Sequence, residues 1–200
     1  MSSSPSVSRP PILCIVGRKD SGKTELTVAL AGELNRRGYR VMTAKHGHGF
    51  RLDHPGKDSW RHRHEGGALR TVLAGPRDFA VVGEWPRDLE PSGELDLEEL
   101  VRRFLPDADI VLAEGFKASR APRVEVFRAG VHEDPLYDPG NPEARHYLAL
   151  VSDRAMEGLP VPVHSLDDPD HVQALAHQVE ELIRRSGSGE SPSVRPSVRS

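Results

Sequence analysis

One eight-residue segment near the N-terminus constrains this chain most. It matches the pattern G-x-x-x-x-G-K-[ST] between Gly17 and Thr24. The glycines let consecutive backbone N–H groups face one hollow, and the N-terminus of the following helix attracts an anion. The Lys23 ammonium then reaches the β- and γ-phosphates of a nucleotide, and the Thr24 hydroxyl can bind Mg²⁺. The predicted phosphate-binding loop (P-loop, or Walker A) consists of Gly17, Lys19, Asp20, Ser21, Gly22, Lys23, Thr24 and the adjacent Glu25.

The apolar pattern around this loop predicts an α/β fold of the P-loop NTPase-like class. Strands alternate with amphipathic helices, which indicates a mostly parallel sheet with helices on both faces. We expect strands at residues 11–16, 40–44, 69–74, 79–84, 109–113, 124–127 and 147–151, and helices at 24–37, 97–105 and 169–185. One nucleotide-binding domain is expected at residues 11–185, with an extended surface loop at 129–145. The ends, 1–10 and 186–200, are rich in Ser, Pro, Gly and Arg and are expected to be disordered tails.

A second acidic motif follows the predicted strand at 109–113. Asp109 to Gly115 is an apolar run that ends in an acid and a glycine, which is the form of a Walker B segment. Ligands of open α/β sheets bind at the carboxyl ends of the strands, so Glu114 should lie near the P-loop. Asp109, at the other end of the strand, should be a surface residue. We therefore expect Lys23 and Glu114 as catalytic residues and Thr24 and Glu114 as Mg²⁺ ligands, the alternative for Glu114 being a helix or loop cap. We also expect additional strands after this Walker B segment, at residues 124–127 and 147–151.

Composition narrows the function classes. The chain has a net charge of −3, which argues against a general nucleic-acid binder. No apolar run approaches the roughly 20 residues of a membrane-spanning helix, and the N-terminus lacks the apolar core of a secretory signal. The single cysteine, Cys14, lies among aliphatic residues and is expected to pack in the core. These features indicate a cytoplasmic protein that binds neither nucleic acid nor membrane.

A basic, histidine-rich segment follows the predicted strand at 40–44. Five of the ten histidines fall between His46 and His64. The segment can be an anion-binding surface over the triphosphate, a transition-metal site, or a solvated loop without chemistry. Asp53 and Asp58 can orient water or a metal ion, or pair with neighbouring arginines. The residues singled out as a possible anion, pterin or partner loop are Lys45, His46, His48, Lys57, Asp58 and Arg61.

These motifs together resemble the MobB family of GTP-binding adaptor proteins. The resemblance covers about residues 11–185. It rests on the P-loop, Lys45-His46-Gly47-His48, Gly56-Lys57-Asp58-Ser59 followed by Arg61-His62, Glu114-Gly115-Phe116-Lys117, and the strand at residues 123–128. Two departures from the family pattern are Glu25, where a threonine is often repeated, and Gly49, which replaces the last histidine of the usual Lys-His-x-His-His.

The resemblance implies a role in making molybdopterin guanine dinucleotide. On this basis we expect GTP and Mg²⁺ as cofactors, weak GTP hydrolysis, a homodimer, and partnership with MobA, the guanylyltransferase that attaches GMP to molybdopterin. Lys23 and Thr24 would contact the nucleotide, while Glu114, with Asp53 as a further candidate, would serve Mg²⁺. The basic segment would face the nucleotide or a phosphate of bound molybdopterin.

Guanine selectivity has one candidate residue. The chain has no Asn-Lys-x-Asp segment, but Asp153 ends a late strand and could accept hydrogen bonds from guanine N1 and N2. The alternative for Asp153 is a turn at a strand end. Three other functions remain open: a nickel or zinc metallochaperone GTPase, a small-molecule P-loop kinase, and a non-enzymatic scaffold.

Overall fold

The structure, a computed structural model, describes residues 9–47, 53–85 and 96–186. The chain divides into two compact units, one made of Met1–His46 and Asp96–Ser200 and the other of Gly47–Leu95. The sequence predicted one nucleotide-binding domain at residues 11–185, and that the two units act as one domain stays a prediction. Most of the expected tails lies outside the described residues.

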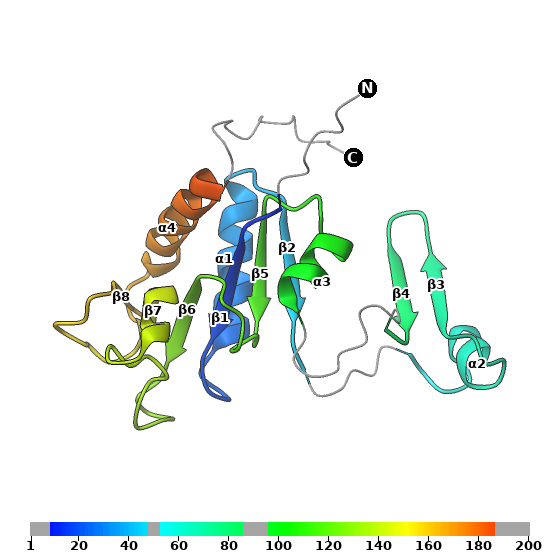
Figure 1. Cartoon of the computed structure of the whole chain (residues 1–200), viewed down its shortest axis with the longest axis horizontal. Coiled ribbons are helices and arrows are strands. Elements are labelled where there is room, and N and C mark those ends of the chain that lie inside the picture. Colours follow the sequence, from blue (N-terminus) through cyan, green and yellow to red (C-terminus); the bar gives the residue numbers. More distant parts are fainter. Residues whose placement is uncertain (1–8, 48–52, 86–95, 187–200) are drawn as a thin grey trace. The chain divides into compact units, whose positions relative to one another are not determined.

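The larger unit is built on a six-stranded sheet (Figure 1). Its strands follow the spatial order β2-β5-β1-β6-β7-β8, and every neighbouring pair is parallel. The α/β class and the mostly parallel sheet are therefore confirmed, with β6, β7 and β8 as the additional strands. The strands are β1 (Ile12–Val16), β2 (Val41–Lys45), β5 (Ile110–Glu114), β6 (Arg123–Phe127), β7 (Tyr147–Ser152) and β8 (Val163–Ser165).

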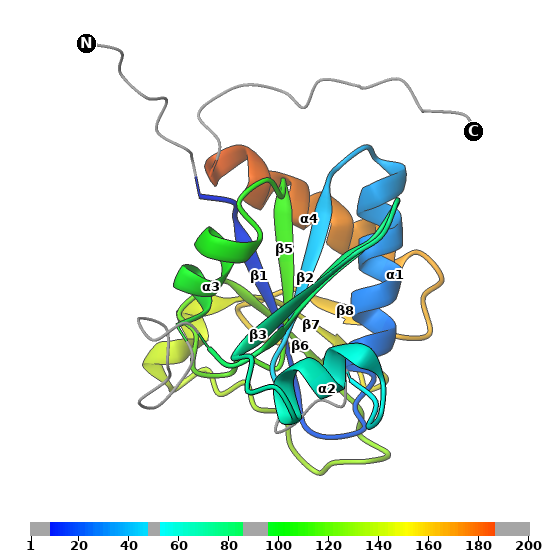
Figure 2. The same cartoon turned by 90° about the vertical axis from the view of Figure 1, so that its right-hand side faces the viewer.

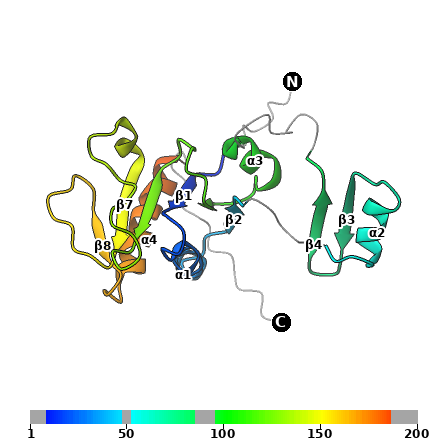
Figure 3. The same ribbon diagram turned by 90° about the horizontal axis from the view of Figure 1, so that it is seen from below.

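Helices cover both faces of this sheet, as expected. Figures 2 and 3 show α1 (Lys23–Arg36) and α4 (His171–Ser186) on one face and α3 (Leu97–Phe104) on the other. The apolar stripe of α1, which includes Leu30 and Leu34, packs with α4 and with the sheet in one buried cluster. A short 3₁₀ helix, η1 (Pro142–His146), lies within the loop expected at 129–145. No described helix combines the length and apolar composition that a transmembrane span requires.

Strands β1 and β5 explain why the chain folds around the P-loop. Every residue of β1 and β5 is buried, because helices cover both faces. Cys14 is a free, fully buried cysteine of β1, as expected. Parallel pairing sets Ile15 and Lys45 on either side of Glu114, at the carboxyl edge of the sheet. Asp109 lies at the opposite end of the sheet and accepts a hydrogen bond from the Arg40 backbone N at 2.7 Å.

The smaller unit contains a short helix and a hairpin. Strands β3 (Arg70–Ala74) and β4 (Phe79–Gly83) were both expected, and they pair antiparallel as a separate two-stranded sheet. Helix α2 (Asp58–His64) was not expected from the sequence, because it buries no residue and so shows no apolar period. Local contacts support it instead, including stacking of the Trp60 and His64 rings, whose centroids are 4.3 Å apart.

Candidate nucleotide-binding site

The P-loop has an open, strongly curved backbone between β1 and α1. Gly17 and Gly22 have φ angles of 147° and 95°, and Asp20 has a φ of 62°. A Cβ atom at Gly17 would lie 2.5 Å from the Val126 carbonyl oxygen, so the loop cannot hold a side chain at that position. Gly22 directly precedes helix α1, where no side chain caps the helix N-terminus. The free N–H groups of the first turn are therefore available to an anion.

Lys23 points into the loop that it follows. Its Nζ atom donates a hydrogen bond to the Arg18 carbonyl oxygen at 2.5 Å. Burial lowers the pKa of Lys23, and the nearby cations Lys117 and Lys45 add to this effect, while Glu114 opposes it. The hydrogen bond to Arg18 therefore places the ammonium group against the P-loop backbone.

Glu114 and Thr24 meet at the edge of the loop. The Thr24 hydroxyl donates a hydrogen bond to the Glu114 carboxylate, with 3.0 Å to Oε1 and 3.1 Å to Oε2. Lys45 Nζ lies 3.0 Å from Oε1 of the same carboxylate. Glu114 is only 9% exposed, and its position next to Lys45 follows from the pairing of β2 with β5. Two residues 90 positions apart, each expected to serve Mg²⁺, are therefore in direct contact. A hydroxyl and a carboxylate are hard oxygen donors of the kind that Mg²⁺ prefers, so the pair fits that ion.

Lys23, Thr24 and Glu114 line one cavity of about 530 Å³. This volume lies within the range of small-molecule sites in proteins. Gly17 and Ser21 are not among the lining residues, and Ser21 is buried. The lining residues are Lys19, Asp20, Gly22, Lys23, Thr24, Glu25, Glu114 and Arg128. Seven of the eight were expected from the sequence.

Arg128 is the one residue of this lining that was not expected from the sequence. It directly follows β6 at the carboxyl edge of the sheet, beside the P-loop. A Cβ atom at Gly22 would lie 3.5 Å from Arg128 Nε. A basic residue directly after a buried strand is the signal that could have identified it, since Glu114 ends its strand at the same edge.

A buried acid organises the segment after β6. Glu125 is fully buried, and its carboxylate accepts hydrogen bonds from the backbone N–H groups of Leu136 at 2.6 Å and Tyr137 at 2.8 Å. Burial raises the pKa of Glu125, although both hydrogen bonds oppose that shift. The segment expected as an extended surface loop is thus anchored to the sheet, with Tyr137 buried.

The same segment also holds the P-loop from outside. His132 Nε2 lies 2.7 Å from the Lys19 carbonyl oxygen, and Arg18 Nε donates to the Asp134 carbonyl oxygen at 3.3 Å. These contacts join two chain segments more than 110 residues apart. They brace the outer side of the P-loop, and nothing in the spacing of the sequence indicated them.

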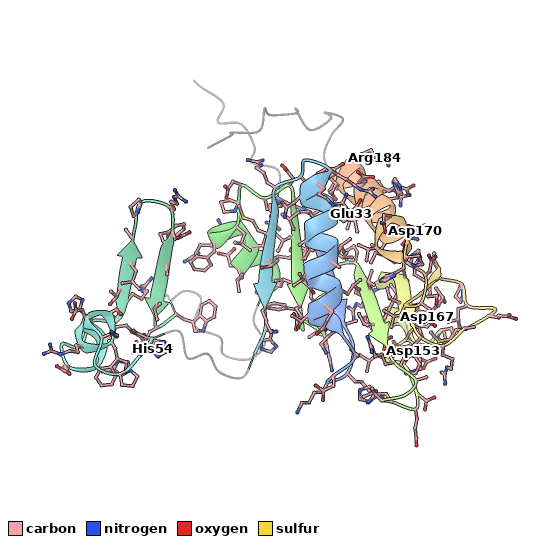
Figure 4. The ribbon with its side chains drawn as sticks, turned by 180° about the vertical axis from the view of Figure 1, so that it is seen from behind. Glu33, His54, Asp153, Asp167, Asp170 and Arg184 are labelled. Atoms are coloured by element: carbon pink, nitrogen blue, oxygen red, sulfur yellow. The ribbon has the colours of Figure 1, made fainter. Side chains whose placement is uncertain are left out.

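Asp153 lies at the same edge of the sheet, at the end of β7 (Figure 4). Its Oδ1 atom accepts a hydrogen bond from the Ala129 backbone N at 2.8 Å. This contact ties the ends of β6 and β7 together, as a turn residue at a strand end would. The side chain is exposed, and its contact with a guanine base stays a prediction.

The basic segment is divided between the two units. Lys45 and His46 belong to the P-loop unit, where His46 packs on Phe116 with ring centroids 5.4 Å apart. In the smaller unit, Asp58 begins α2 directly after Lys57, and Arg61 Nε pairs with Glu65 at 2.9 Å. His48 lies outside the described residues.

Asp53 has local partners in the smaller unit. Its Oδ1 atom accepts hydrogen bonds from Ser59 Oγ at 2.9 Å and from the His54 backbone N at 3.1 Å. Arg63 Nη1 lies 3.7 Å from Oδ2. Within the described ranges, no group of three or more His, Cys, Asp or Glu residues could hold a metal ion.

Comparison with known proteins supports one family. A family model described as molybdopterin guanine dinucleotide synthesis protein B (MobB) matches residues 12–153, which include the P-loop and Glu114. The molybdopterin-guanine dinucleotide biosynthesis adapter protein of Haemophilus influenzae is 37% identical over 144 residues, which are 71% of this chain and 74% of that protein.

Solved structures agree with this match. A crystal structure of molybdopterin-guanine biosynthesis protein B is 30% identical, with a TM-score of 0.60, and the match covers 86% of this chain and 99% of that one. The structure of a MobB homologue from Bacillus stearothermophilus is 25% identical, with a TM-score of 0.58. That match covers 85% of this chain and 98% of the homologue. Bacillus subtilis MobB, at 23% identity and a TM-score of 0.60 over 84% of this chain and 97% of its own, supports the fold alone. The family model, the relative and the shared fold confirm the resemblance carried by the motifs: this chain belongs to the MobB family.

Proposed function

We propose that this chain is a GTP-binding adaptor protein in the synthesis of molybdopterin guanine dinucleotide, with weak GTPase activity. Membership of the MobB family supports a role in molybdopterin guanine dinucleotide synthesis. The relative at 37% identity is named an adapter protein. The observation that carries nucleotide binding is the contact between Thr24 and Glu114 beside the P-loop lysine. This contact brings the end of the P-loop motif and the acid that ends β5 together at the carboxyl edge of a parallel sheet, where ligands bind.

The P-loop binds the phosphates in this proposal. Backbone N–H groups of the loop and of the first turn of α1 donate to the phosphate oxygens, and the positive end of the helix dipole adds to the attraction. Lys23 supplies the positive charge for the β- and γ-phosphates, and its Nζ atom already lies within the loop.

Mg²⁺ is assigned to Thr24 and Glu114. When bound, this ion would neutralise charge on the β- and γ-phosphate oxygens. The Thr24 hydroxyl and the Glu114 carboxylate would hold it, and Lys45 keeps that carboxylate oriented through its contact at 3.0 Å. Asp53 stays a further candidate ligand.

Hydrolysis is expected to be slow. Many P-loop GTPases use a glutamine to orient the attacking water. This chain has only two glutamines, Gln173 and Gln178, and both lie on α4. An adaptor role therefore suits the site better than fast catalysis does.

Asp153 is proposed to select guanine. Its carboxylate would accept hydrogen bonds from the N1 and N2 groups of guanine, which adenine cannot reproduce. The position of Asp153 supports this assignment, because the residue directly follows β7 at the edge of the sheet where ligands bind.

The proposed partners are the guanylyltransferase MobA and molybdopterin. Lys45, His46, His48, Lys57, Asp58 and Arg61 stay the candidate residues for contacting a phosphate of the pterin or the transferase. We also assign the protein to the cytoplasm, where its nucleotide and its proposed partner enzyme would be found.

A homodimer is proposed through the β3–β4 hairpin. Both strands expose apolar side chains, with Val72 at 64%, Val81 at 51% and Phe79 at 79% exposure. An isolated two-stranded sheet is marginally stable and leaves edges that can pair with another strand, so a second copy of the chain is the occupant we propose. Light scattering should show a dimer at micromolar concentration, and a monomer there would contradict this part of the proposal.

The test of the main proposal is a nucleotide titration. The wild type should bind GTP with Mg²⁺ more tightly than ATP, while Lys23→Ala should bind both at least about tenfold more weakly, because it loses charge-assisted hydrogen bonds. Equal binding by the variant would refute the phosphate assignment, and a preference for ATP would refute the base assignment. A reconstituted guanylylation reaction containing MobA, run with and without this protein, should proceed faster when it is present.

The metallochaperone, kinase and non-enzymatic scaffold alternatives are not favoured by any observation. Stoichiometric Ni²⁺ or Zn²⁺ binding that His46→Ala abolishes would support the first. GTP-dependent transfer of phosphate to a small hydroxyl compound would support the second. Binding of GTP with no hydrolysis at all, together with GTP-dependent capture of the transferase, would support the third.

A further inference from the structure

Arg128 lies against the P-loop where helix α1 begins. A Cβ atom at Gly22 would lie 3.5 Å from Arg128 Nε and 3.6 Å from Nη2. The same side chain lines the cavity that contains Lys23. Its guanidinium therefore lies beside Gly22 of the P-loop, in the same cavity as the P-loop lysine.

The side-chain N–H groups of Arg128 are available to bind a ligand. Within the described ranges, no hydrogen bond or ion pair involves its side-chain nitrogens. Arg37 and Arg123, by contrast, donate to partners within the protein, for example from Arg123 Nη1 to the Lys117 carbonyl oxygen at 3.1 Å. A guanidinium carries five N–H donors in a fixed fork that matches phosphate oxygens, so Arg128 can bind an anion without first breaking a contact.

The backbone of Arg128 is well fixed. Its carbonyl oxygen accepts hydrogen bonds from the backbone N–H groups of His132 at 2.9 Å and Val131 at 3.1 Å. The next residue, Ala129, donates to Asp153 at 2.8 Å. The start of the side chain is thus held in place, which reduces the ordering cost of binding a ligand.

The strand order assigns Arg128 to one end of the nucleotide. Strand β1 lies between β5, which ends in Glu114, and β6, which Arg128 follows. The Thr24–Glu114 pair marks the side where Mg²⁺ would meet the β- and γ-phosphates. Arg128 lies on the other side, towards β7 and Asp153, the residue that follows β7. That side should receive the nucleoside and the phosphate attached to it.

We propose that Arg128 binds the α-phosphate, the phosphate attached directly to the nucleoside, and so helps to hold GTP and GDP alike. This inference rests on the nucleotide binding proposed above and adds a phosphate contact from the segment after β6. Because the α-phosphate is common to both nucleotides, the residue should set their affinity without distinguishing between them.

The test compares three variants with the wild type. Arg128→Ala should raise the dissociation constants for GTP and GDP by similar factors, about ten- to a hundredfold, since it removes charge-assisted hydrogen bonds. Arg128→Lys should give an intermediate loss, because it keeps the charge but not the fork. Arg184→Ala is the control: it removes the same charge from an exposed position at the opposite end of the sheet from Asp153 (Figure 4) and should leave both affinities unchanged.

The affinities are measured by calorimetry with Mg²⁺, and far-UV circular dichroism confirms that each variant is folded. Unchanged affinity in Arg128→Ala would overturn the inference. A loss for GTP alone would also overturn it, because the guanidinium would then contact the γ-phosphate. If the wild type itself binds no GTP, the proposed function fails. If Lys23→Ala loses binding and Arg128→Ala does not, only the inference about Arg128 fails.

Discussion

Gly17 is the P-loop position where one added methyl group conflicts most directly with the structure. Its φ angle of 147° is rarely adopted by residues with a side chain. A Cβ atom there would lie 2.5 Å from the Val126 carbonyl oxygen and 2.7 Å from Ser21 Oγ. The first neighbour is backbone of β6 and cannot rotate away. Gly17→Ala must therefore displace either the loop or the strand.

The expected cost has two parts. A residue held in a sparsely populated backbone conformation costs about 1–3 kcal/mol. Overpacking against fixed neighbours costs about 1–3 kcal/mol more. The sum, about 2–6 kcal/mol, is a large share of the 5–15 kcal/mol that stabilises a typical domain. Gly17→Ala should unfold the P-loop unit at markedly lower urea concentration and weaken GTP binding.

Gly32 provides a matched control for this substitution. It lies within α1, and a Cβ atom there would meet nothing within 4 Å. Gly32→Ala should therefore stabilise the protein by about 0.5–1 kcal/mol through helix propensity. The two tryptophans, Trp60 and Trp85, both belong to the smaller unit, so far-UV circular dichroism should be used instead of fluorescence. Wild-type stability and GTP affinity in Gly17→Ala would refute the reasoning.

Two further substitutions test polar groups that hold the fold together. Burial raises the pKa of Glu125, so the folded state binds more protons than the unfolded one between the ordinary glutamate pKa and the raised value. The free energy of unfolding of the wild type, relative to that of Glu125→Gln, should therefore fall as pH rises through that window, by at most about 1.4 kcal/mol per pH unit. Urea denaturation at a series of pH values measures this slope. A flat pH dependence would contradict the prediction. Arg37 joins α1 to α4 through Glu33 at 2.7 Å and Glu180 at 2.8 Å. Arg37→Ala should cost about 1–3 kcal/mol, while Arg185→Ala, whose side chain is 80% exposed, should cost less than about 0.5 kcal/mol in the same denaturation assay.

The larger unit could be predicted from the sequence because its signals are local. The apolar runs of β1 and β5 and the leucine spacing of α1 reflect burial that neighbours in the chain already encode. The observed bounds differ from the expected ones by one or two residues. Helix α2 and strand β8 were missed for a different reason. Neither carries an apolar pattern. Local hydrogen bonds define α2, and pairing with the edge of β7 defines β8.

The site was predictable where function requires a fixed spacing. The P-loop and Glu114 were found because a strand end, a turn and a helix start fix their positions together. Glu125 was not found as an organising residue, because an acid inside a strand is usually taken to face solvent. Its burial depends on two backbone N–H groups, those of residues 136 and 137. Contacts of that kind exist only once the fold has formed.

The segment after β6 gives the site a second half. Glu125 anchors it to the sheet, His132 and Arg18 connect it to the outer side of the P-loop, and Arg128 lines the same cavity as Lys23. A P-loop alone offers donors on one side of a polyphosphate. Strand β6 is the neighbour of β1 on the side away from Glu114, so the segment that continues it can supply a cation at the proposed nucleoside end. In the proposed site, the order of strands β5-β1-β6 therefore separates the metal side from the nucleoside side, and it explains why the contacts that brace the loop come from the segment after β6.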